Sequence, residues 1–307
     1  MKKIMFMVLG FVLLLGCTTP ELISRNLPLL SSRSGEQVAQ DLTARYADTR
    51  SHCDDVEEVA HRCTGVIFRG TSFSPQYHSW NPNPASAEPK NGVSFSYLRA
   101  DSNFRSLAYN YVNGFIFYPE NNRPAGKDRM VVRCFFPVDA GSDVRKPDGC
   151  GPTTHAGSYD SRPCQVLGIT TGQQWLAHFL AIPVAAPRGF FQCGFDVRAI
   201  RGKDAAKAFV QAIDAMRRAG EESFRIQNEL IITPWPQNAG ATLPIEAFFY
   251  TLEHAGGLTS AQADQRDLFN TDGIVRPIIL MTLPTAATGR ATFQFRQADQ
   301  ALSLTAY

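Results

Sequence analysis

A succession of short β-type segments fills most of this chain from Cys63 onward. Each segment is rich in Val, Ile, Phe, Tyr or Thr and is bounded by Gly, Pro, Asn or Asp, and several alternate apolar with polar residues, as half-buried strands do. The segments are 63–71, 92–100, 114–119, 129–138, 189–197, 229–235, 245–252 and 274–283. We therefore expect a sheet of many short strands.

A few segments with helical periodicity interrupt these strands. The clearest is 204–220, where Asp204 is expected to cap the helix and Gly220 to end it, with Phe209, Ile213 and Met216 on one face. Further helices are expected at 34–46, at 172–181 and at 259–270, the last capped by Thr259 or Ser260. Strands interrupted by a few helices predict an α+β fold with mainly antiparallel sheets and flanking helices. Hydrophobic residues make up 44% of the chain, which is enough for a substantial core.

The N-terminus has the pattern of an export signal. Lys2 and Lys3 precede an uncharged run that ends at Gly16-Cys17, and this run is too short to span a bilayer as a mature helix. The residues Leu14-Leu15-Gly16-Cys17 resemble the bacterial lipobox, which implies cleavage after residue 16 and a lipid on Cys17; the alternative is plain secretion. Without an acidic residue after Cys17, an outer-membrane lipoprotein or a secreted protein is expected, with Cys17 as its only membrane attachment.

Charge excludes one class of partner. The chain has 30 basic and 28 acidic residues, and loss of Lys2 and Lys3 with the signal leaves 28 of each. No run of Lys and Arg occurs, whereas a nucleic-acid-binding protein normally carries a basic excess on one face. We therefore expect no nucleic-acid partner.

The cysteines indicate a fold held by disulfides. Of the seven in the sequence, six follow Cys17, and they are Cys53, Cys63, Cys134, Cys150, Cys164 and Cys193. An even number in an exported chain implies disulfides, although sequence alone does not settle their connectivity. The pairs Cys53 with Cys63 and Cys150 with Cys164 are the first to consider, because each closes a short segment. Zinc is the rival reading, but the close Cys or His pairs that it needs are missing, so no metal is expected.

Three fragments at strand ends carry chemically useful side chains. Arg69 ends an apolar strand and is followed at once by Gly70. An arginine at the end of a strand can direct its guanidinium at a phosphate or carboxylate. Ser94 and Ser96 share one face of a strand, with aromatic residues on the other. Gln227 and Glu229 lie on one side of the chain at the start of another strand. Each fragment alone is also compatible with an ordinary solvent-facing residue.

Together, in this order, the fragments resemble the R-S-E class of mono-ADP-ribosyltransferase toxins and effectors. In that class an Arg ends the first strand, a Ser-x-Ser triplet opens a second, and a Gln-x-Glu or Glu-x-Glu pair precedes a later one. The whole chain is also similar to the halovibrin group of secreted bacterial NAD-dependent proteins. The resemblance implies an ADP-ribosyltransferase-like fold with an NAD cleft in a single catalytic domain, residues 51–307, which follows a signal peptide (1–16) and a tether with an N-terminal helix (17–50).

The resemblance also implies a role for each residue. Glu229 would stabilise the oxocarbenium-like transition state formed when the nicotinamide-ribose bond of NAD breaks. Ser94 would hydrogen-bond to Glu229 and position it, and Arg69, beside Gly70, would engage the dinucleotide phosphates. Ser96 would support the strand or the nicotinamide side, while Gln227 would face an acceptor. With water as the acceptor, the same site is an NAD glycohydrolase.

Two alternatives remain open at this point. The stretch between Ser94 and Glu229 is longer than family members usually need, so either it contains an insertion or the carboxylate is a different one, and Glu246 is the substitute. A non-enzymatic surface lipoprotein that binds a partner through disulfide-held loops would explain the signal, the anchor and the cysteines equally well.

Overall fold

The computed structural model describes residues 33–53, 59–71, 93–102, 104–119, 131–140, 150, 163–183, 188–197, 202–220, 227–233, 244–286 and 289–302. The expected signal peptide and the lipobox with Cys17 lie outside the described residues. Within the described part of the chain, no helix is both long and apolar enough to cross a membrane.

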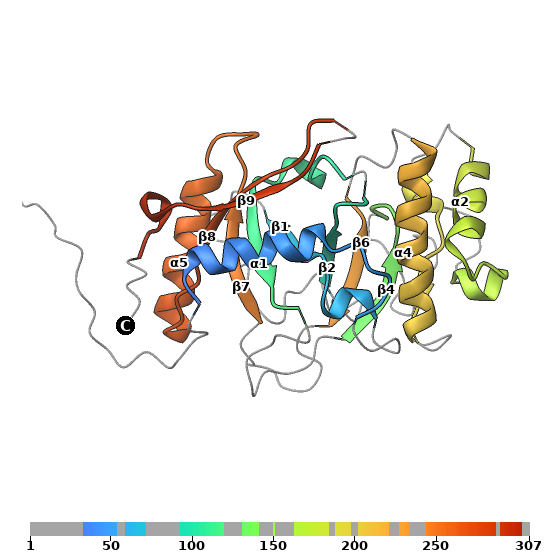
Figure 1. The fold of residues 1–307 in the computed structure, drawn as a ribbon, viewed down its shortest axis with the longest axis horizontal. Coiled ribbons are helices and arrows are strands. Elements are labelled where there is room, and N and C mark those ends of the chain that lie inside the picture. Colours follow the sequence, from blue (N-terminus) through green and yellow to red (C-terminus); the bar gives the residue numbers. More distant parts are fainter. Residues whose placement is uncertain are drawn as a thin grey trace, which may run out of the picture.

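Nine strands follow one another in the order β5-β4-β6-β2-β1-β3-β7-β8-β9 (Figure 1). Every neighbouring pair is antiparallel except β7 and β8, which are parallel because helix α5 crosses between them. The prediction of an α+β fold with a mainly antiparallel sheet is confirmed. The strands are β1 (Val66–Thr71), β2 (Val93–Leu98), β3 (Asn113–Phe117), β4 (Val131–Phe136), β5 (Phe195–Asp196), β6 (Glu229–Thr233), β7 (Ile245–Tyr250), β8 (Ile278–Thr282) and β9 (Thr292–Phe295).

Five α-helices lie in the described part of the chain, and two of them differ in detail from the prediction. Asp204 lies inside the first turn of α4 and does not cap it, and α5 begins after Gly256, two residues before the predicted cap Thr259. The α-helices are α1 (Gly35–Ala47), α2 (Gly172–Ala181), α3 (Arg188–Phe191), α4 (Gly202–Ala219) and α5 (Gly257–Asp272). Short 3-10 helices are η1 (Ala60–Arg62), η3 (Ala108–Asn110), η7 (Cys164–Leu167) and η9 (Gln297–Asp299).

Two expectations about strands were incomplete. The segment 189–197 was predicted as one strand, but it begins with the last residues of α3, and only Phe195–Asp196 pair, with β4. The side chain of Gln192 bonds to the backbone of Val138 and so draws this segment away from an extended path. Strand β9 was not predicted, because its short sequence alternates buried and exposed residues over only four positions.

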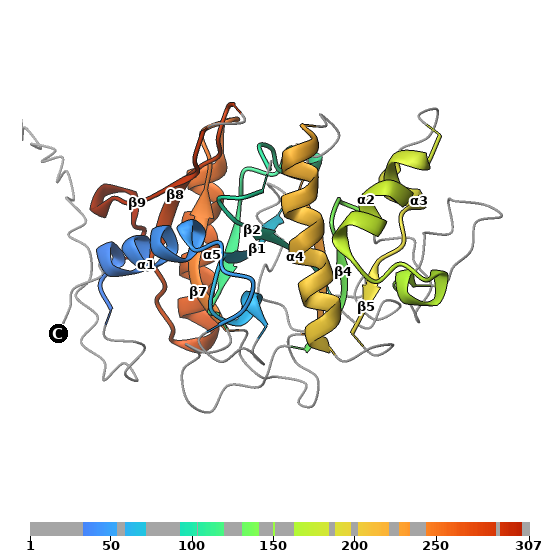
Figure 2. The same cartoon turned by 45° about the vertical axis from the view of Figure 1, so that its right-hand side comes forward.

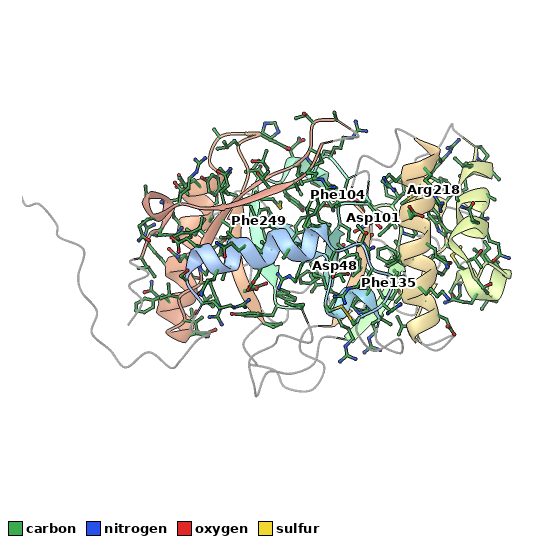
Figure 3. All side chains as sticks on the ribbon, viewed as in Figure 1. Asp48, Asp101, Phe104, Phe135, Arg218 and Phe249 are labelled. Carbon is green, nitrogen blue, oxygen red and sulfur yellow. A yellow bond between two sulfur atoms is a disulfide. The ribbon has the colours of Figure 1, made fainter. Side chains whose placement is uncertain are left out.

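Two large apolar clusters hold the elements together. Helix α1 crosses the strands in Figure 1 and buries Val38, Leu42 and Tyr46 in a cluster that also contains Phe68. Phe104 and Phe249, labelled in Figure 3, both pack on the ring of Phe68.

The second cluster contains residues of several strands and of helices α2, α4 and α5, and Figure 2 shows where these helices lie. The predicted apolar face of α4, formed by Phe209, Ile213 and Met216, is buried there, and Phe209 stacks on Phe135 of β4. Full burial of a side chain of this size contributes about 1.5–3 kcal/mol to stability. The face of α4 thus fixes the position of β4, which in turn pairs with β6.

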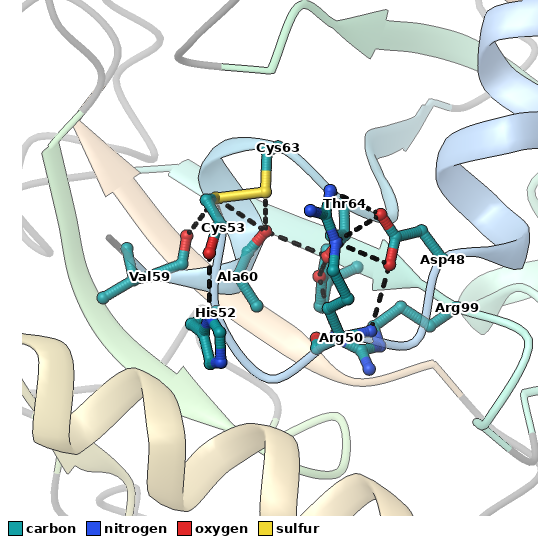
Figure 4. The surroundings of a disulfide bond; sticks show 10 residues. Asp48, Arg50, His52, Cys53, Val59, Ala60, Cys63, Thr64 and Arg99 are labelled. Atoms are coloured by element: carbon teal, nitrogen blue, oxygen red, sulfur yellow. Dashed lines mark hydrogen bonds and ion pairs between the residues drawn. A yellow bond between two sulfur atoms is a disulfide. The ribbon is translucent and has the colours of Figure 1, made fainter. Parts of the chain in front are cut away.

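Three disulfides join the six cysteines, and one of the two suggested pairs is correct. Cys53 bonds to Cys63 beside Thr64 and Arg99 (Figure 4). The suggested pair Cys150–Cys164 is wrong. Cys150 bonds to Cys134 of β4, and Cys164 bonds to Cys193. The pairing follows spatial neighbours: the backbone of Gly194 bonds to both Cys150 and Cys164, so Cys193 is presented to Cys164.

Candidate active site around Glu229

Strand β2 changes its pairing partner in the middle of the Ser-x-Ser motif. Val93 to Phe95 pair with β6, whereas Ser96 to Leu98 pair with β1. The two halves of the sheet therefore meet at Ser94 and Ser96. A change of partner of this kind leaves backbone groups on either side of β2 that side chains must satisfy.

Ser94 and Glu229 are in direct contact across this junction. The hydroxyl of Ser94 donates to Oε1 of Glu229 at 2.6 Å, although the residues are 135 positions apart in the chain. Oε2 of the same carboxylate accepts the backbone N–H of Ala140 at 3.0 Å. Glu229 is only 1% exposed, and these two donors offset the hydration that a buried carboxylate loses.

Arg69 joins this pair through the backbone of β2. Its Nη1 donates to the carbonyl oxygen of Ser94 at 2.7 Å, at the point where β1 has stopped pairing with β2. The side chain is partly exposed. The prediction that Arg69 ends its strand is wrong, because β1 continues to Thr71 through its pairing with β3. The structure therefore brings together the guanidinium, the serine and the carboxylate that the sequence singled out.

Gly70 and Gly114 keep the backbone near Arg69 tightly packed. A Cβ on Gly70 would lie 2.7 Å from the ring of Tyr111, and a Cβ on Gly114 would lie 1.9 Å from the carbonyl oxygen of Arg69. Gly70 thus makes room for an aromatic ring beside Arg69. The close approach of the Tyr111 ring is therefore sufficient to explain why residue 70 is a glycine.

Ser96 and Gln227 are both buried and both bonded within the protein. Ser96 donates from Oγ to the backbone carbonyl of Asn228 at 3.3 Å. The Oε1 of Gln227 accepts the N–H of Ala108 at 3.3 Å, and its carbonyl accepts the N–H of Asp139 at 2.7 Å. Ser96 therefore supports the backbone next to Glu229, and the Gln227 amide oxygen is directed at η3.

Asn228, the middle residue of Gln-x-Glu, was not singled out by the sequence. Its side chain makes two hydrogen bonds of 2.8 Å to the backbone N–H and C=O of Tyr97 in β2. An asparagine at the start of an apolar strand is unfavourable unless its amide is satisfied, which is the one sequence signal that could have identified it.

A small apolar cluster lies next to the carboxylate. It consists of Phe136, Ala140 and Ile231 together with the disulfide between Cys134 and Cys150. Ala140 belongs both to this cluster and to the hydrogen bond with Glu229. The surroundings of Glu229 therefore combine oriented donors with apolar groups, in which a carboxylate interacts strongly with a positive charge.

Glu246, the alternative carboxylate, has a different environment. It is fully buried on β7 and bonds to Arg45 at 2.5 and 3.2 Å and to Arg33 at 3.1 Å. Its charge is therefore neutralised by two guanidinium groups that attach the N-terminal helix to the sheet. This arrangement is typical of a structural ion pair.

Within the described residues, no group of three or more His, Cys, Asp or Glu side chains is placed to hold a metal ion. The buried His61 packs against Phe135, and burial, followed by the charge of Arg62, lowers its pKa to about 4. It is therefore neutral at physiological pH and belongs to the core.

Comparison with known proteins identifies no family. No protein-family model matches the chain, and no curated protein matches it.

Proposed function

We propose that this protein is an exported NAD-dependent enzyme, a mono-ADP-ribosyltransferase or an NAD glycohydrolase with an ADP-ribosyltransferase-like fold. The observation that carries the proposal is the hydrogen bond between Ser94 and Glu229, with Arg69 bonded to the carbonyl of the same serine. These residues come from three separate strands, and the resemblance assigns them to one reaction. The three strands are neighbours in the order β6-β2-β1, which brings the three side chains into one region of the sheet.

The chemistry follows from the charge that develops when the nicotinamide leaves. Positive charge builds on the ribose, and a fixed carboxylate stabilises that transition state more than it stabilises NAD itself. Glu229 would supply the negative charge of this carboxylate and would accept a hydrogen bond from a ribose hydroxyl. Ser94 would hold one carboxylate oxygen in place, so that little reorganisation is needed during the reaction.

Arg69 and the serine pair would orient the dinucleotide. A guanidinium binds phosphate oxygens in a fixed geometry, and the Arg69 side chain is partly exposed at the point where β1 stops pairing with β2. Ser96 keeps the backbone of Asn228 against β2 and so supports the same wall of the site. Gln227 would face either water or an acceptor side chain after its amide leaves Ala108.

Substrate binding requires a local opening. Oε2 of Glu229 is occupied by the N–H of Ala140, and the carboxylate is almost fully covered. In the proposed reaction a ribose hydroxyl takes the place of that N–H, so the segment that carries Ala140 moves away from Glu229. The conformation in which Ala140 bonds to Glu229 would then be that of the enzyme before NAD binds.

One observation favours a second candidate, a non-enzymatic surface lipoprotein that binds a partner. Glu229, Gln227 and Ser96 are all buried and bonded inside the protein, as residues with a purely structural role would be. The three disulfides suit either function.

Nicotinamide release separates the two candidates. The oxidised protein without its signal peptide is incubated with NAD, and free nicotinamide and labelled ADP-ribose are followed with water alone and with added protein acceptors. The proposal expects release that Glu229→Gln abolishes, while the control Glu36→Gln, at an exposed position of α1, retains it. If wild-type protein of verified fold releases no nicotinamide under any acceptor condition, the binding module is the better account.

A further inference from the structure

The side-chain amide of Asn228 replaces a pair of backbone hydrogen bonds between β2 and β6. The register of β2 and β6 runs from Val93↔Ile232 to Phe95↔Leu230. Two residues further along each strand, it would place Asn228 opposite Tyr97. At that position the two bonds to the backbone of Tyr97 come from the Asn228 side chain, with Oδ1 accepting from N–H and Nδ2 donating to C=O, each at 2.8 Å.

Because the side chain of Asn228 makes these two bonds, the backbone of the Gln-x-Glu segment is not tied to β2 at this position. The carbonyl of Asn228 accepts from Ser96 Oγ, and the carbonyl of Gln227 accepts from the N–H of Asp139. The chain therefore turns toward the segment that carries Ala140 while the hydrogen-bonding groups of Tyr97 stay satisfied. A backbone ladder alone would keep residues 227–229 flat against β2.

The anchor of this contact is rigid. Tyr97 is fully buried, its ring lies against Phe209 of α4, and its hydroxyl bonds to Thr64 at 2.7 Å. Asn228 is itself only 4% exposed. The amide thus connects the segment that carries Glu229 to one of the most firmly held residues of the core.

We propose that Asn228 is a positioning residue for Glu229: its amide fixes the carboxylate against Ser94 and has no contact with NAD. The proposal rests on the proposed function for its catalytic consequence, although the positioning itself can be measured without NAD. Asparagine is suited to the task because a short side chain must present one acceptor and one donor to the same residue. Aspartate keeps the shape but lacks the donor, and alanine lacks both groups.

The test compares Asn228→Asp and Asn228→Ala with the wild type. The control is Gln265→Ala, because Gln265 is a buried amide that also bridges backbone groups, donating to Arg276 O and accepting from Ala301 N, away from Glu229. The first measurement is residue-resolved amide hydrogen exchange. The N–H of Ala140 bonds to Glu229 and not to Asn228. If Asn228 positions Glu229, exchange at Ala140 accelerates by roughly tenfold or more in both Asn228 variants, but not in Gln265→Ala.

The second measurement is the rate of nicotinamide release. A carboxylate displaced by about 1 Å is expected to lower kcat by on the order of 100-fold. The KM for NAD should stay within about twofold, because the contact of Arg69 with Ser94 does not involve Asn228.

Several outcomes are decisive. Folded Asn228 variants with unchanged exchange at Ala140 would overturn the positioning role, and so would a loss of rate that Gln265→Ala reproduces. If the wild type releases no nicotinamide but Ala140 exchange accelerates only in the Asn228 variants, the NAD function fails and the positioning of Glu229 stands. Should Asn228→Ala not fold, Asn228→Asp supports the same comparison, because it retains the acceptor for the Tyr97 N–H.

Discussion

The backbone N–H of Ala140 lies 3.0 Å from Oε2 of Glu229, so the segment after β4 covers the carboxylate that we assign to catalysis. Gln192 fixes this segment: its side chain bonds to both the N–H and the C=O of Val138. Removing an N–H from a buried carboxylate is costly unless another donor replaces it. A ribose hydroxyl is such a donor. Residues 137–140, which we call the cover, therefore compete with the substrate for the Glu229 carboxylate.

Weakening the cover should favour NAD binding. We expect Gln192→Ala to lower the KM for NAD by a few-fold, because the open form becomes more populated and less binding energy is spent on opening. Amide exchange at Ala140 should accelerate in the same variant. The matched control is Gln165→Ala, because Gln165 bridges the backbone of Asp196 in the same manner and lies on η7. Faster exchange with an unchanged KM would show that the cover does not limit binding.

Loss of the Ser94 hydroxyl should affect turnover more than binding. In Ser94→Ala one oxygen of a buried carboxylate loses its donor, which costs about 1–3 kcal/mol of stability and holds the Glu229 carboxylate less firmly in its orientation. We expect kcat to fall by roughly 10- to 100-fold with a much smaller change in KM. Ser102→Ala is the control, since the hydroxyl of Ser102 donates to a backbone carbonyl, that of Arg99. Full activity in Ser94→Ala would contradict the assigned role.

Replacement of Arg69 by lysine should mainly raise the KM. Lysine keeps the charge but loses the planar fork that can bond to Ser94 O and to a phosphate in a fixed geometry. A rise of about tenfold corresponds to ~1.4 kcal/mol of lost binding. Arg50→Lys provides the comparison, because Arg50 forms an exposed ion pair with Asp48 (Figure 4). An equal effect of both substitutions would point to a general effect of charge geometry, not to a phosphate site.

The sequence predicted most elements of the fold because their signals are local. The alternation around Ser94 and Ser96 predicted β2, and the spacing of Phe209, Ile213 and Met216 predicted the buried face of α4. The pairing of Cys134 with Cys150 could not be obtained in this way. It depends on which segments lie beside β4: the carbonyl of Cys150 accepts the N–H of Gly194, which directly precedes β5, the neighbour of β4.

The site was predictable only in part for the same reason. The contact between Ser94 and Glu229 was expected from the order of the motifs and a family resemblance, and spacing alone would not have suggested it. Asn228 was treated as a spacer, because its role arises from the register between β2 and β6, which the sequence does not specify. The cover formed by Ala140 likewise has no local signal, since any residue except proline offers the same N–H.

Glu246 provides a direct test of which carboxylate acts. In Glu246→Gln the buried guanidinium group of Arg45 loses its carboxylate partner, whereas Arg33 keeps its ion pair with Asp41, and a loss of about 3–5 kcal/mol of stability is expected. Nicotinamide release per folded molecule should persist below the lowered melting temperature, whereas Glu229→Gln should abolish release with a smaller change in stability. The reverse pattern of activities would transfer the catalytic assignment to Glu246.

Acid should destabilise the protein through His61. Its pKa in the folded state is about 4, against an ordinary value of 6.5, because burial disfavours the charged ring and Arg62 repels it. The unfolded chain therefore binds the proton more readily than the folded protein. The stability associated with neutral His61 is complete above pH 6.5 and falls as the pH drops toward 4, by roughly 3 kcal/mol for a shift of this size.

The measurement is urea unfolding between pH 4 and pH 7 for the wild type and for His61→Leu, which keeps an apolar contact with Phe135. We expect the variant to lose less stability toward pH 4 than the wild type, whatever its stability at pH 7. Chemical denaturation with constant m-values makes the two slopes comparable. Parallel pH profiles would show that carboxylates elsewhere, and not His61, determine the acid sensitivity.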